Sequence, residues 1–474
     1  MSTQTSSASQ LTLPEEFRDP AFRRRRTQNW LVLGVLYAFF YMSRYNFAAV
    51  MASLSSTFGW TNTQLGIFET MMPLVYGLSV VFNGPIADRF GGKKAFLFGA
   101  AGVTVMNLAF GSCLLLVQTP AVMEGVGHAA KVVTPAVLRF GMSPKAVLTL
   151  MASVWGINGY FQSFGALSIV KVNAQWFHVR ERGTFAGIFG VLIRFGLILA
   201  FSGVPLILTV LPLPFAFWLP GAFVGVVALV NLFMMENAPK DAGFSDLDTG
   251  DDAGHDDGKP ASLSFVLNKV FASGATWMIA LSSMMIGMVR RSTIDSWWPK
   301  YFKDMHGVAS VAAPYQTTVW GIAILGIMGG FAFGIASDRV YGGRRAPVIT
   351  MGFVGMTATL LAFGLVDHAG RLGPWAAAIF LPILSFFVNG AHGMIGGAAS
   401  MDFGGKKAAA TAAGLFDGMQ YLASSFVGIG MGYMLDRWGW SAWQFAPIPF
   451  AVVGALVISR LWNVVPGRPA QKSA

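Results

Sequence analysis

The sequence predicts an all-α membrane protein whose twelve transmembrane helices form two six-helix bundles. Three observations lead to this fold class. Apolar runs of about 20 residues recur along the chain, mean hydropathy is +0.57, and only 12% of the 474 residues are charged. Soluble globular proteins carry about 25% charged residues. The composition therefore excludes an ordinary soluble enzyme, a disordered chain and the usual kind of nucleic-acid-binding protein.

The apolar runs fall into six spans, an acidic linker and six more spans. We expect an N-terminal tail at 1–28, a first bundle at 29–235, the linker at 236–266, a second bundle at 267–462 and a C-terminal tail at 463–474. The expected spans are 29–50, 64–85, 96–117, 146–170, 184–209, 214–235, 270–299, 315–336, 347–366, 374–398, 408–432 and 441–462. A long loop is expected between the third and fourth spans.

The distribution of positive charge predicts the orientation of the chain. An even number of spans places both termini on one side, together with the linker. That side carries about three times as many Lys and Arg residues as the other, and the cytoplasmic side is the one enriched in these residues. Both termini are therefore predicted to be cytoplasmic.

A repeated loop pattern supports the division into two halves. Each copy has a glycine, then Asp-Arg four residues later, then two glycines and two basic residues. The copies contain Gly84, Asp88 and Arg89 after the second span, and Gly334, Asp338 and Arg339 after the eighth. We expect the glycines to allow a tight turn and close helix contact, and the aspartates to pair with basic groups or cap helix ends. The pattern resembles the loop signature of the major facilitator superfamily, which implies two bundles around a central site.

Charged side chains within the spans indicate an anionic substrate. The cations are Arg44, Lys171, Arg194, Arg290 and Arg291, and the acids are Glu69, Asp295 and Asp417. Each unpaired arginine at mid-membrane costs about 2.5–3.5 kcal/mol on insertion scales. An excess of cations around a central site therefore favours binding of an anion.

Two of the arginines occupy nearly equivalent places in the two halves. Arg44 precedes Gly84 by 40 residues, and Arg291 precedes Gly334 by 43. Two guanidinium groups facing each other suit the oxygens of a phosphate group. Arg290 is the alternative candidate for the second phosphate-binding arginine. Neighbouring helix positions point about 100° apart, so Arg290 and Arg291 cannot both face the site equally.

Asp295 follows Arg291 by four residues, so it is expected to orient that guanidinium. Tyr37 and Tyr41 share a helix face with Arg44, and Tyr76 lies in the second span. Their hydroxyl groups are expected either to bind phosphate or to serve in helix packing.

Several motifs together resemble the organophosphate:phosphate antiporters, such as the bacterial glycerol-3-phosphate and hexose-phosphate permeases. They are Tyr37-x-x-x-Tyr41-x-x-Arg44-x-Asn46-Phe47, Leu65-Gly66 with Tyr76-Gly77-x-Ser79, Gln175-Trp176-Phe177 with Arg180-Glu181-Arg182-Gly183, Arg291-x-x-Ile294-x-x-Trp297-x-Pro299-x-Tyr301 and Lys406-Lys407-Ala408-Ala409 with Thr411-Ala412-Ala413-Gly414. The resemblance implies that Arg44 and Arg291 bind phosphate, that Tyr37, Tyr41, Tyr76 and Tyr421 line the cavity, and that the protein lies in the bacterial plasma membrane.

This chain departs from the family pattern at Val80, Gln175, Arg194 and Asp417. Arg194 either binds a second acidic group of the substrate, as in a phosphoglycerate, or pairs with Asp417. His392 in the tenth span either joins the substrate site or a proton relay, or packs between helices.

We therefore expect a monomeric secondary transporter that exchanges an organic phosphate ester for inorganic phosphate, not an enzyme, with no cofactor or metal and no nucleic-acid partner. No nucleotide-binding motif is present in the sequence. One alternative is a proton-coupled organic-anion symporter that uses Glu69, Asp417 or His392. The other is a transporter-like sensor of sugar phosphates.

Overall fold

The computed structural model describes residues 15–116, 143–178, 181–245, 247, 249 and 273–464. These residues are helical, with no strand among them. The long loop expected after the third span and most of the acidic linker lie outside the described residues, as does the side chain of Asp88.

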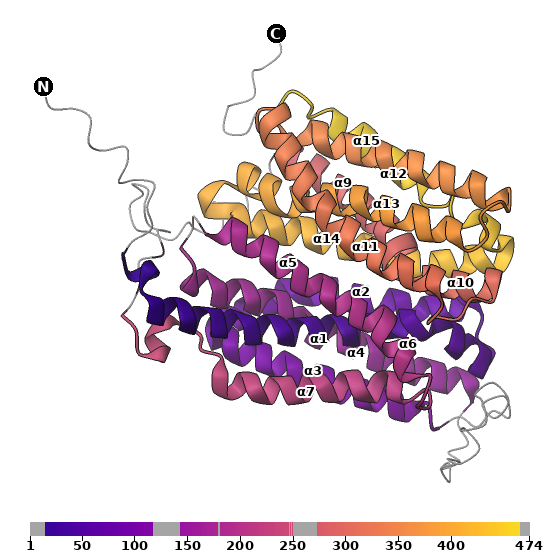
Figure 1. The fold of residues 1–474 in the computed structure, drawn as a ribbon, viewed down its shortest axis with the longest axis horizontal. Coiled ribbons are helices and arrows are strands. Elements are labelled where there is room, and N and C mark those ends of the chain that lie inside the picture. The colour runs from indigo at the N-terminus through magenta and orange to yellow at the C-terminus, as the bar shows by residue number, and fades with distance from the viewer. Residues whose placement is uncertain are drawn as a thin grey trace, which may run out of the picture.

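The first half of the chain forms one bundle, drawn from indigo to magenta in Figure 1. Its helices are α1 (Pro20–Phe58), α2 (Asn62–Phe90), α3 (Gly92–Cys113), α4 (Pro144–Trp176), α5 (Arg182–Ile198), α6 (Val204–Ile207) and α7 (Phe215–Met234), with a π-helical turn at Leu199–Gly203 between α5 and α6. Short 3-10 helices lie at Glu15–Arg18 and Pro239–Ala242. Within this bundle, α4 packs on α2 and α3, and α1 packs on α5 and α7.

The second half forms the other bundle, drawn from orange to yellow. Its helices are α9 (Gly274–Arg290), α10 (Trp298–His306), α11 (Ala313–Ile335), α12 (Arg345–His368), α13 (Trp375–Gly393), α14 (Ser400–Trp438) and α15 (Ile448–Ser459). Between them lie π-helical turns at Arg291–Asp295, Ala336–Val340 and Met394–Ala399, and a 3-10 helix at Trp440–Ala442. Here α13 packs on α11 and α12, while α9 packs on α14 and α15.

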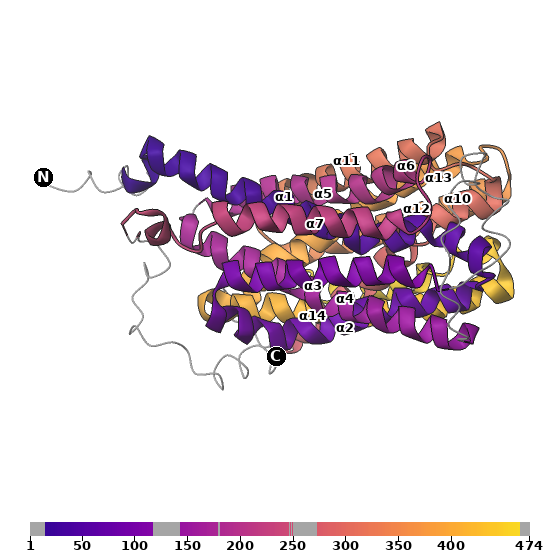
Figure 2. The same cartoon turned by 90° about the horizontal axis from the view of Figure 1, so that it is seen from below.

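The helices of both bundles run along the long axis of the molecule, as Figure 2 shows from a second side. The bundles meet mainly where α2 crosses α14, with further contact of α5 with α11 and of α1 with α10. We call the end at which α1 begins the tail end, and the end at which α2 begins the far end.

Several helices extend beyond the predicted spans because their ends are capped outside the apolar stretch. α1 begins at Pro20 instead of residue 29, because the Asp19 carboxylate accepts hydrogen bonds from the backbone N–H groups of Ala21 (3.1 Å) and Phe22 (3.4 Å). Proline at the first helical position strengthens this start. Arg26, in the added turns, is buried against Glu181 at 2.7 Å.

Six of the described helical segments are long and apolar enough to cross a membrane by length and composition: Gly92–Cys113, Gly190–Ile207, Phe215–Met234, Ala313–Val340, Arg345–His368 and Trp375–Gly396. Helices α1, α2, α4, α9 and α14 are not in this set. They carry many of the buried polar side chains that contact one another across the molecule. This division is expected of a helical membrane protein, because intramembrane polar residues face the bundle interior instead of the lipid.

Candidate functional site

Arg44 lies in the middle of α1 and is 4% exposed. Its guanidinium carbon lies over the rings of Tyr41 (4.8 Å) and Tyr76 (4.7 Å), in cation–π geometry. Its Nε and Nη2 donate hydrogen bonds to Oε1 of Gln162 in α4, and its Nη1 donates to the Tyr421 hydroxyl in the other bundle at 3.3 Å. Arg44 has no carboxylate within ion-pair distance in the described structure, so a buried positive charge is held only by neutral groups.

The predicted tyrosines do not all play the same part. Tyr76 and Tyr421 bring the two bundles together beside Arg44, with their ring centroids 4.3 Å apart. Tyr41 packs edge-on against Tyr37 at 5.1 Å. Tyr37 itself is buried in the aromatic core of the first bundle with Phe40 and Phe96.

The span that contains the adjacent arginines is not one regular helix. α9 ends at Arg290, a π-helical turn covers Arg291–Asp295, and the backbone leaves helical geometry at Ser296 (φ −142°) before α10 begins. In a π-helix, residues five apart in sequence share a face. This places Asp295 beneath Arg290, whose Nε lies 2.9 Å from Asp295 Oδ2.

The prediction that Asp295 orients Arg291 is therefore wrong, because the four-residue spacing assumed an α-helix. Arg291 instead pairs with Glu69 of α2, with Nη2 2.6 Å from Oε2. The same nitrogen also donates to the Glu69 backbone carbonyl at 3.3 Å. Arg291 and Glu69 are both buried, and their charges are satisfied by each other across the two bundles.

Arg290, not Arg291, lies within electrostatic reach of the groups around Arg44. Asp417 interacts with both Arg44 and Arg290, and Tyr421 does the same. The Tyr45 hydroxyl donates to Asp295 at 3.4 Å, which ties α1 to the Arg290 pair.

Arg194 completes this region from α5. Its Nη2 donates a hydrogen bond to Oδ1 of Asn389 in α13, and it has no ion pair with any described residue. The alternative that Arg194 pairs with Asp417 is therefore wrong in this structure. His392, also in α13, lies with Nδ1 3.1 Å from the Gln420 amide nitrogen, and both Arg194 and Arg290 act on it electrostatically. We call Arg44, Arg194 and Arg290 the arginine cluster.

The contact of α2 with α14 closes the far end of the molecule on one side. A methyl group added to Gly66 would overlap the carbonyl oxygen of Gly428, and one added to Gly428 would overlap Thr70, so only glycine permits this approach. The Thr70 hydroxyl donates to the Ser425 carbonyl at 2.7 Å and accepts from the Ile429 N–H at 2.9 Å. We call this crossing the α2–α14 seam.

Asp436 of α14 caps the first turn of α2 across the seam. Its carboxylate accepts from the backbone N–H groups of Asn62 (2.9 Å) and Thr63 (2.8 Å) and from the Thr63 hydroxyl (2.6 Å). Burial opposes ionisation of this half-exposed group, but the hydrogen bonds from Thr63 and Asn62 outweigh it and hold the pKa of Asp436 below its ordinary value.

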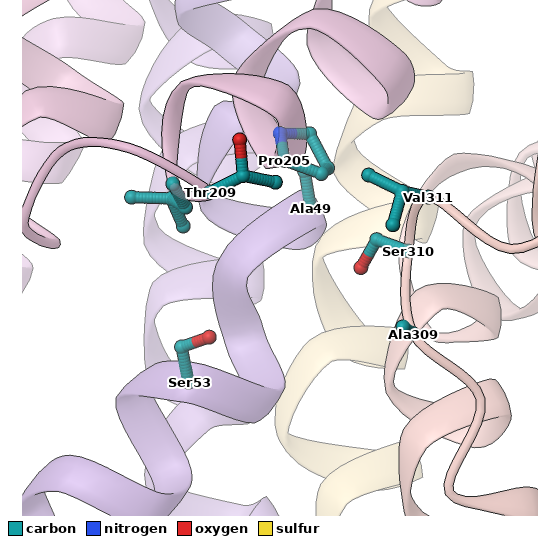
Figure 3. A pocket seen from close by; sticks show the side chains of 8 residues that line it. Ala49, Ser53, Pro205, Thr209, Ala309, Ser310 and Val311 are labelled. Atoms are coloured by element: carbon teal, nitrogen blue, oxygen red, sulfur yellow. The ribbon is translucent and has the colours of Figure 1, made fainter. Parts of the chain in front are cut away.

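A small pocket of about 160 Å³ opens between the bundles at the far end (Figure 3). It lies away from the arginine cluster, so it is not the predicted site. Its walls come from α1, from the chain around α6 and from the loop before α11: Ala49, Ser53, Pro205, Leu208, Thr209, Ala309, Ser310 and Val311.

The first glycine of each motif copy lies inside a helix, and the turn comes later in the motif. α2 continues to Phe90, so Gly84 is helical and has no heavy atom within 4 Å of the position of an added methyl group. The expected role of Gly84 in a turn is therefore wrong, and the turn is made by Gly91, which has φ 86°. In the second copy, Gly334 is likewise helical and Gly342 and Gly343 have positive φ.

The acidic position of the second motif pairs with a basic group, as predicted. Asp338 Oδ1 lies 2.5 Å from Nη1 of Arg345, at the start of α12. Arg89 and Arg339 are both exposed at the tail end.

Residues 33–428 match the family model described as Major Facilitator Superfamily. The chain belongs to this superfamily. The predicted fold of two six-helix bundles is thereby confirmed. A solved structure titled as a bacterial homologue of the human lysosomal transporter Spinster superposes with a TM-score of 0.69 at 14% identity, and the match covers 94% of this chain and 99% of that chain.

Curated relatives match over nearly the full length. The chain is 26% identical to the glycerol-3-phosphate transporter of Bacillus subtilis, with 95% of each chain covered. It is 24% identical to a probable hexose phosphate transport protein of Chlamydia muridarum, covering 95% of this chain and 94% of the relative. It is also 24% identical to the hexose-6-phosphate:phosphate antiporter of Escherichia coli, covering 98% and 95%. The prediction of a multi-pass membrane transporter and not an enzyme is confirmed by these matches.

Sequence reasoning missed two residues that hold the arginines in place. Gln162 fixes Arg44 through two hydrogen bonds and in turn donates to the Phe40 carbonyl at 3.1 Å. Asn389 accepts from Arg194. Both are uncharged polar residues within apolar spans, and such residues are costly unless they have partners. That signal was available in the sequence.

Proposed function

We propose that this protein transports organic phosphate esters across the membrane and exchanges them for inorganic phosphate by alternating access. The observation that carries the proposal is Arg44: a buried guanidinium that has no carboxylate partner in the described part of the chain and lies where the two bundles meet. A guanidinium has five N–H donors. Three nitrogen atoms of Arg44 each make a hydrogen bond to a neutral group, which leaves donors for the oxygens of a phosphate group.

The second phosphate ligand in this proposal is Arg290. It lies on the same side of the π-helical turn as Asp295 and within electrostatic reach of Tyr421 and Asp417, as Arg44 does. Arg290 and Arg291 each have a carboxylate partner, Asp295 and Glu69, but Arg290 lies near the groups around Arg44 and Arg291 faces α2 instead. A phosphate dianion between Arg44 and Arg290 would neutralise charge contributed by opposite bundles and draw them together. Tyr41, Tyr76 and Tyr421 would add hydroxyl groups, and Arg194 and His392 would contact the remainder of the ester.

The contacts between the two bundles indicate which end of the molecule must open. The α2–α14 seam, the Arg291–Glu69 pair and the Asp436 cap all involve residues 62–70, the part of α2 nearest the far end. Breaking these contacts while others form at the tail end would expose the site alternately to the two sides. The paired motif residues Asp338 and Arg345 lie at the tail end, where they would act on the opposite gate.

The positive charge of the tail-end loops supports a cytoplasmic tail end with both termini inside, in a bacterial plasma membrane. The functional unit is proposed to be a monomer, with a first bundle at 29–235 and a second at 267–462 joined by a cytoplasmic linker at 236–266.

Purified protein in liposomes loaded with phosphate provides the test. Labelled phosphate outside should be taken up without ATP, and glycerol 3-phosphate, hexose 6-phosphates and phosphoglycerates should compete to different extents. Uptake that needs ATP, or none at all against internal phosphate, would exclude an exchanger. Substrate binding without any transport would favour a sensor instead.

A further inference from the structure

Asp417 is a carboxyl group of the second bundle that the exchange mechanism does not use. It lies in α14, one helical turn before Tyr421, and it is partly exposed. Among the described residues it has neither a hydrogen bond nor an ion pair, whereas Glu69 is held by Arg291 and Asp295 by Arg290. The backbone carbonyl of its neighbour Phe416 accepts from Ser283 of α9 at 2.8 Å, which fixes this stretch of α14 against the helix that carries Arg290.

The groups that face Asp417 come from every helix around it. Arg44 of α1 and Arg290 of α9 attract it, and the hydroxyls of Tyr76 in α2 and Tyr421 in α14 lie within its electrostatic reach. His392 of α13 lies against the next turn of α14 through Gln420. Asp417 is thus a negative group next to the two arginines proposed to bind phosphate.

We propose that Asp417 is the internal counter-anion of Arg44, as Asp295 is of Arg290, and the proton-binding site of the carrier, so that substrate anion and proton bind together and the empty carrier can reorient. The inference rests on the proposed function. It extends that function from exchange to net, proton-coupled uptake of a phosphate ester.

The physical argument concerns the two states of the site. When it is empty, the Asp417 carboxylate supplies negative charge to the arginines, so their neutralisation does not require a bound anion. When a phosphate dianion enters, the carboxylate repels it, and protonation of Asp417 removes the repulsion. Binding of the anion and of one proton are therefore mutually favourable, and the coupling is reciprocal. The proton enters from the water on the side of substrate binding and leaves with the substrate on the other side.

The other titratable groups are less suited to this role. Glu69 would have to leave a buried ion pair with Arg291 to bind a proton. His392 lies near the positive charges of Arg194 and Arg290, which disfavour a positive charge on its ring.

The experiment compares wild type, Asp417→Asn and Asp417→Glu in liposomes. Each variant is assayed for exchange against internal phosphate and for uptake into phosphate-free liposomes with an acidic exterior. For wild type we expect net uptake that the pH gradient accelerates. For Asp417→Asn we expect measurable exchange but at least a tenfold loss of net uptake, and for Asp417→Glu we expect partial recovery of it.

The pH dependence of affinity gives a second readout. One linked proton changes the apparent Kd of wild type by up to about tenfold per pH unit relative to Asp417→Asn. Titration of the phosphate ester itself is common to both proteins and cancels in the ratio. If wild type and Asp417→Asn have equal net uptake and parallel pH profiles, the inference is wrong. If wild type shows neither exchange nor net uptake, the proposed function fails instead.

Discussion

The arginine cluster and the α2–α14 seam differ in how far their polar and charged groups are paired. In the seam, the Thr70 hydroxyl both donates and accepts, and Asp436 satisfies two backbone N–H groups of α2. Beside the seam, Arg291 pairs with the Glu69 carboxylate of α2. In the cluster, Arg290 pairs with Asp295, but Arg44 and Arg194 have only neutral partners among the described residues. A completed set of contacts holds two bundles together, whereas an incomplete set leaves charge for a ligand.

The contrast is sharpest between two adjacent residues. Arg290 and Arg291 have the same side chain and differ by one position, yet Arg290 belongs to the arginine cluster and Arg291 pairs with Glu69 beside the seam. Substitutions that keep the charge but change the shape should therefore separate the two regions.

The largest effect is expected for Arg44→Lys. Lysine keeps the positive charge but loses the fork that can bind two phosphate oxygens and Gln162 together. We expect exchange to fall at least 100-fold, while the protein still inserts and purifies as a monodisperse species. Phosphate-competition binding to purified protein checks the cause. An apparent Kd within about twofold of wild type would remove Arg44 from the site.

Arg290→Lys and Arg291→Lys should differ by tenfold or more in exchange rate. Lysine can still form an ion pair with Glu69, so Arg291→Lys should keep much of the activity. At position 290, however, lysine cannot replace the guanidinium fork that we propose binds the phosphate. Measuring both variants in the same liposome assay decides the assignment. A dead Arg291→Lys beside an active Arg290→Lys would restore Arg291 as the second phosphate ligand.

A methyl group in the seam should have an intermediate effect. Gly428→Ala overlaps Thr70 and is expected to cost about 1–3 kcal/mol of overpacking, lowering thermal stability and weakening closure at the far end. Gly430→Ala is the matched control, because it lies two residues away on the same helix with open space around it. Thermal unfolding measures the loss of stability. The reaction of a cysteine introduced at position 53, in place of Ser53, with a membrane-impermeant reagent measures opening of the far end. Equal behaviour of the two variants would show that the seam is not tightly packed.

The smallest effect is expected for Asp436→Asn. Loss of such a cap costs about 0.5–2 kcal/mol, and asparagine, whose amide oxygen can still accept a hydrogen bond, loses only part of it. Because hydrogen bonding in the closed seam lowers the pKa of Asp436, its contribution is fully present above its ordinary pKa of 3.8 and is lost as pH falls below that value. Cysteine accessibility at the far end should rise near pH 3–4 in wild type and be raised already at pH 7 in Asp436→Asn. An unchanged profile in the variant would mean that the cap does not hold the seam.

Much of the fold could be predicted from sequence because membrane insertion imposes long apolar spans that are read directly from hydropathy. The placement of Arg44 beside Tyr41 could also be predicted, since residues three and four apart on a regular helix share a face. Helix ends were less predictable, as at Pro20, because they depend on a capping side chain and not on hydropathy.

What the sequence determined by itself is the set of groups: twelve apolar segments in two related halves, with an excess of positive charge at mid-membrane. What only the tertiary structure decided is which charges meet. A π-helical turn at Arg291–Asp295 shifts the face by one residue, so Asp295 holds Arg290 and releases Arg291 to Glu69 in the other bundle. The physical reason is that one added residue in a helical turn rotates the following side chains by about 100°, and the pairing across bundles depends on packing between segments more than 200 residues apart in sequence.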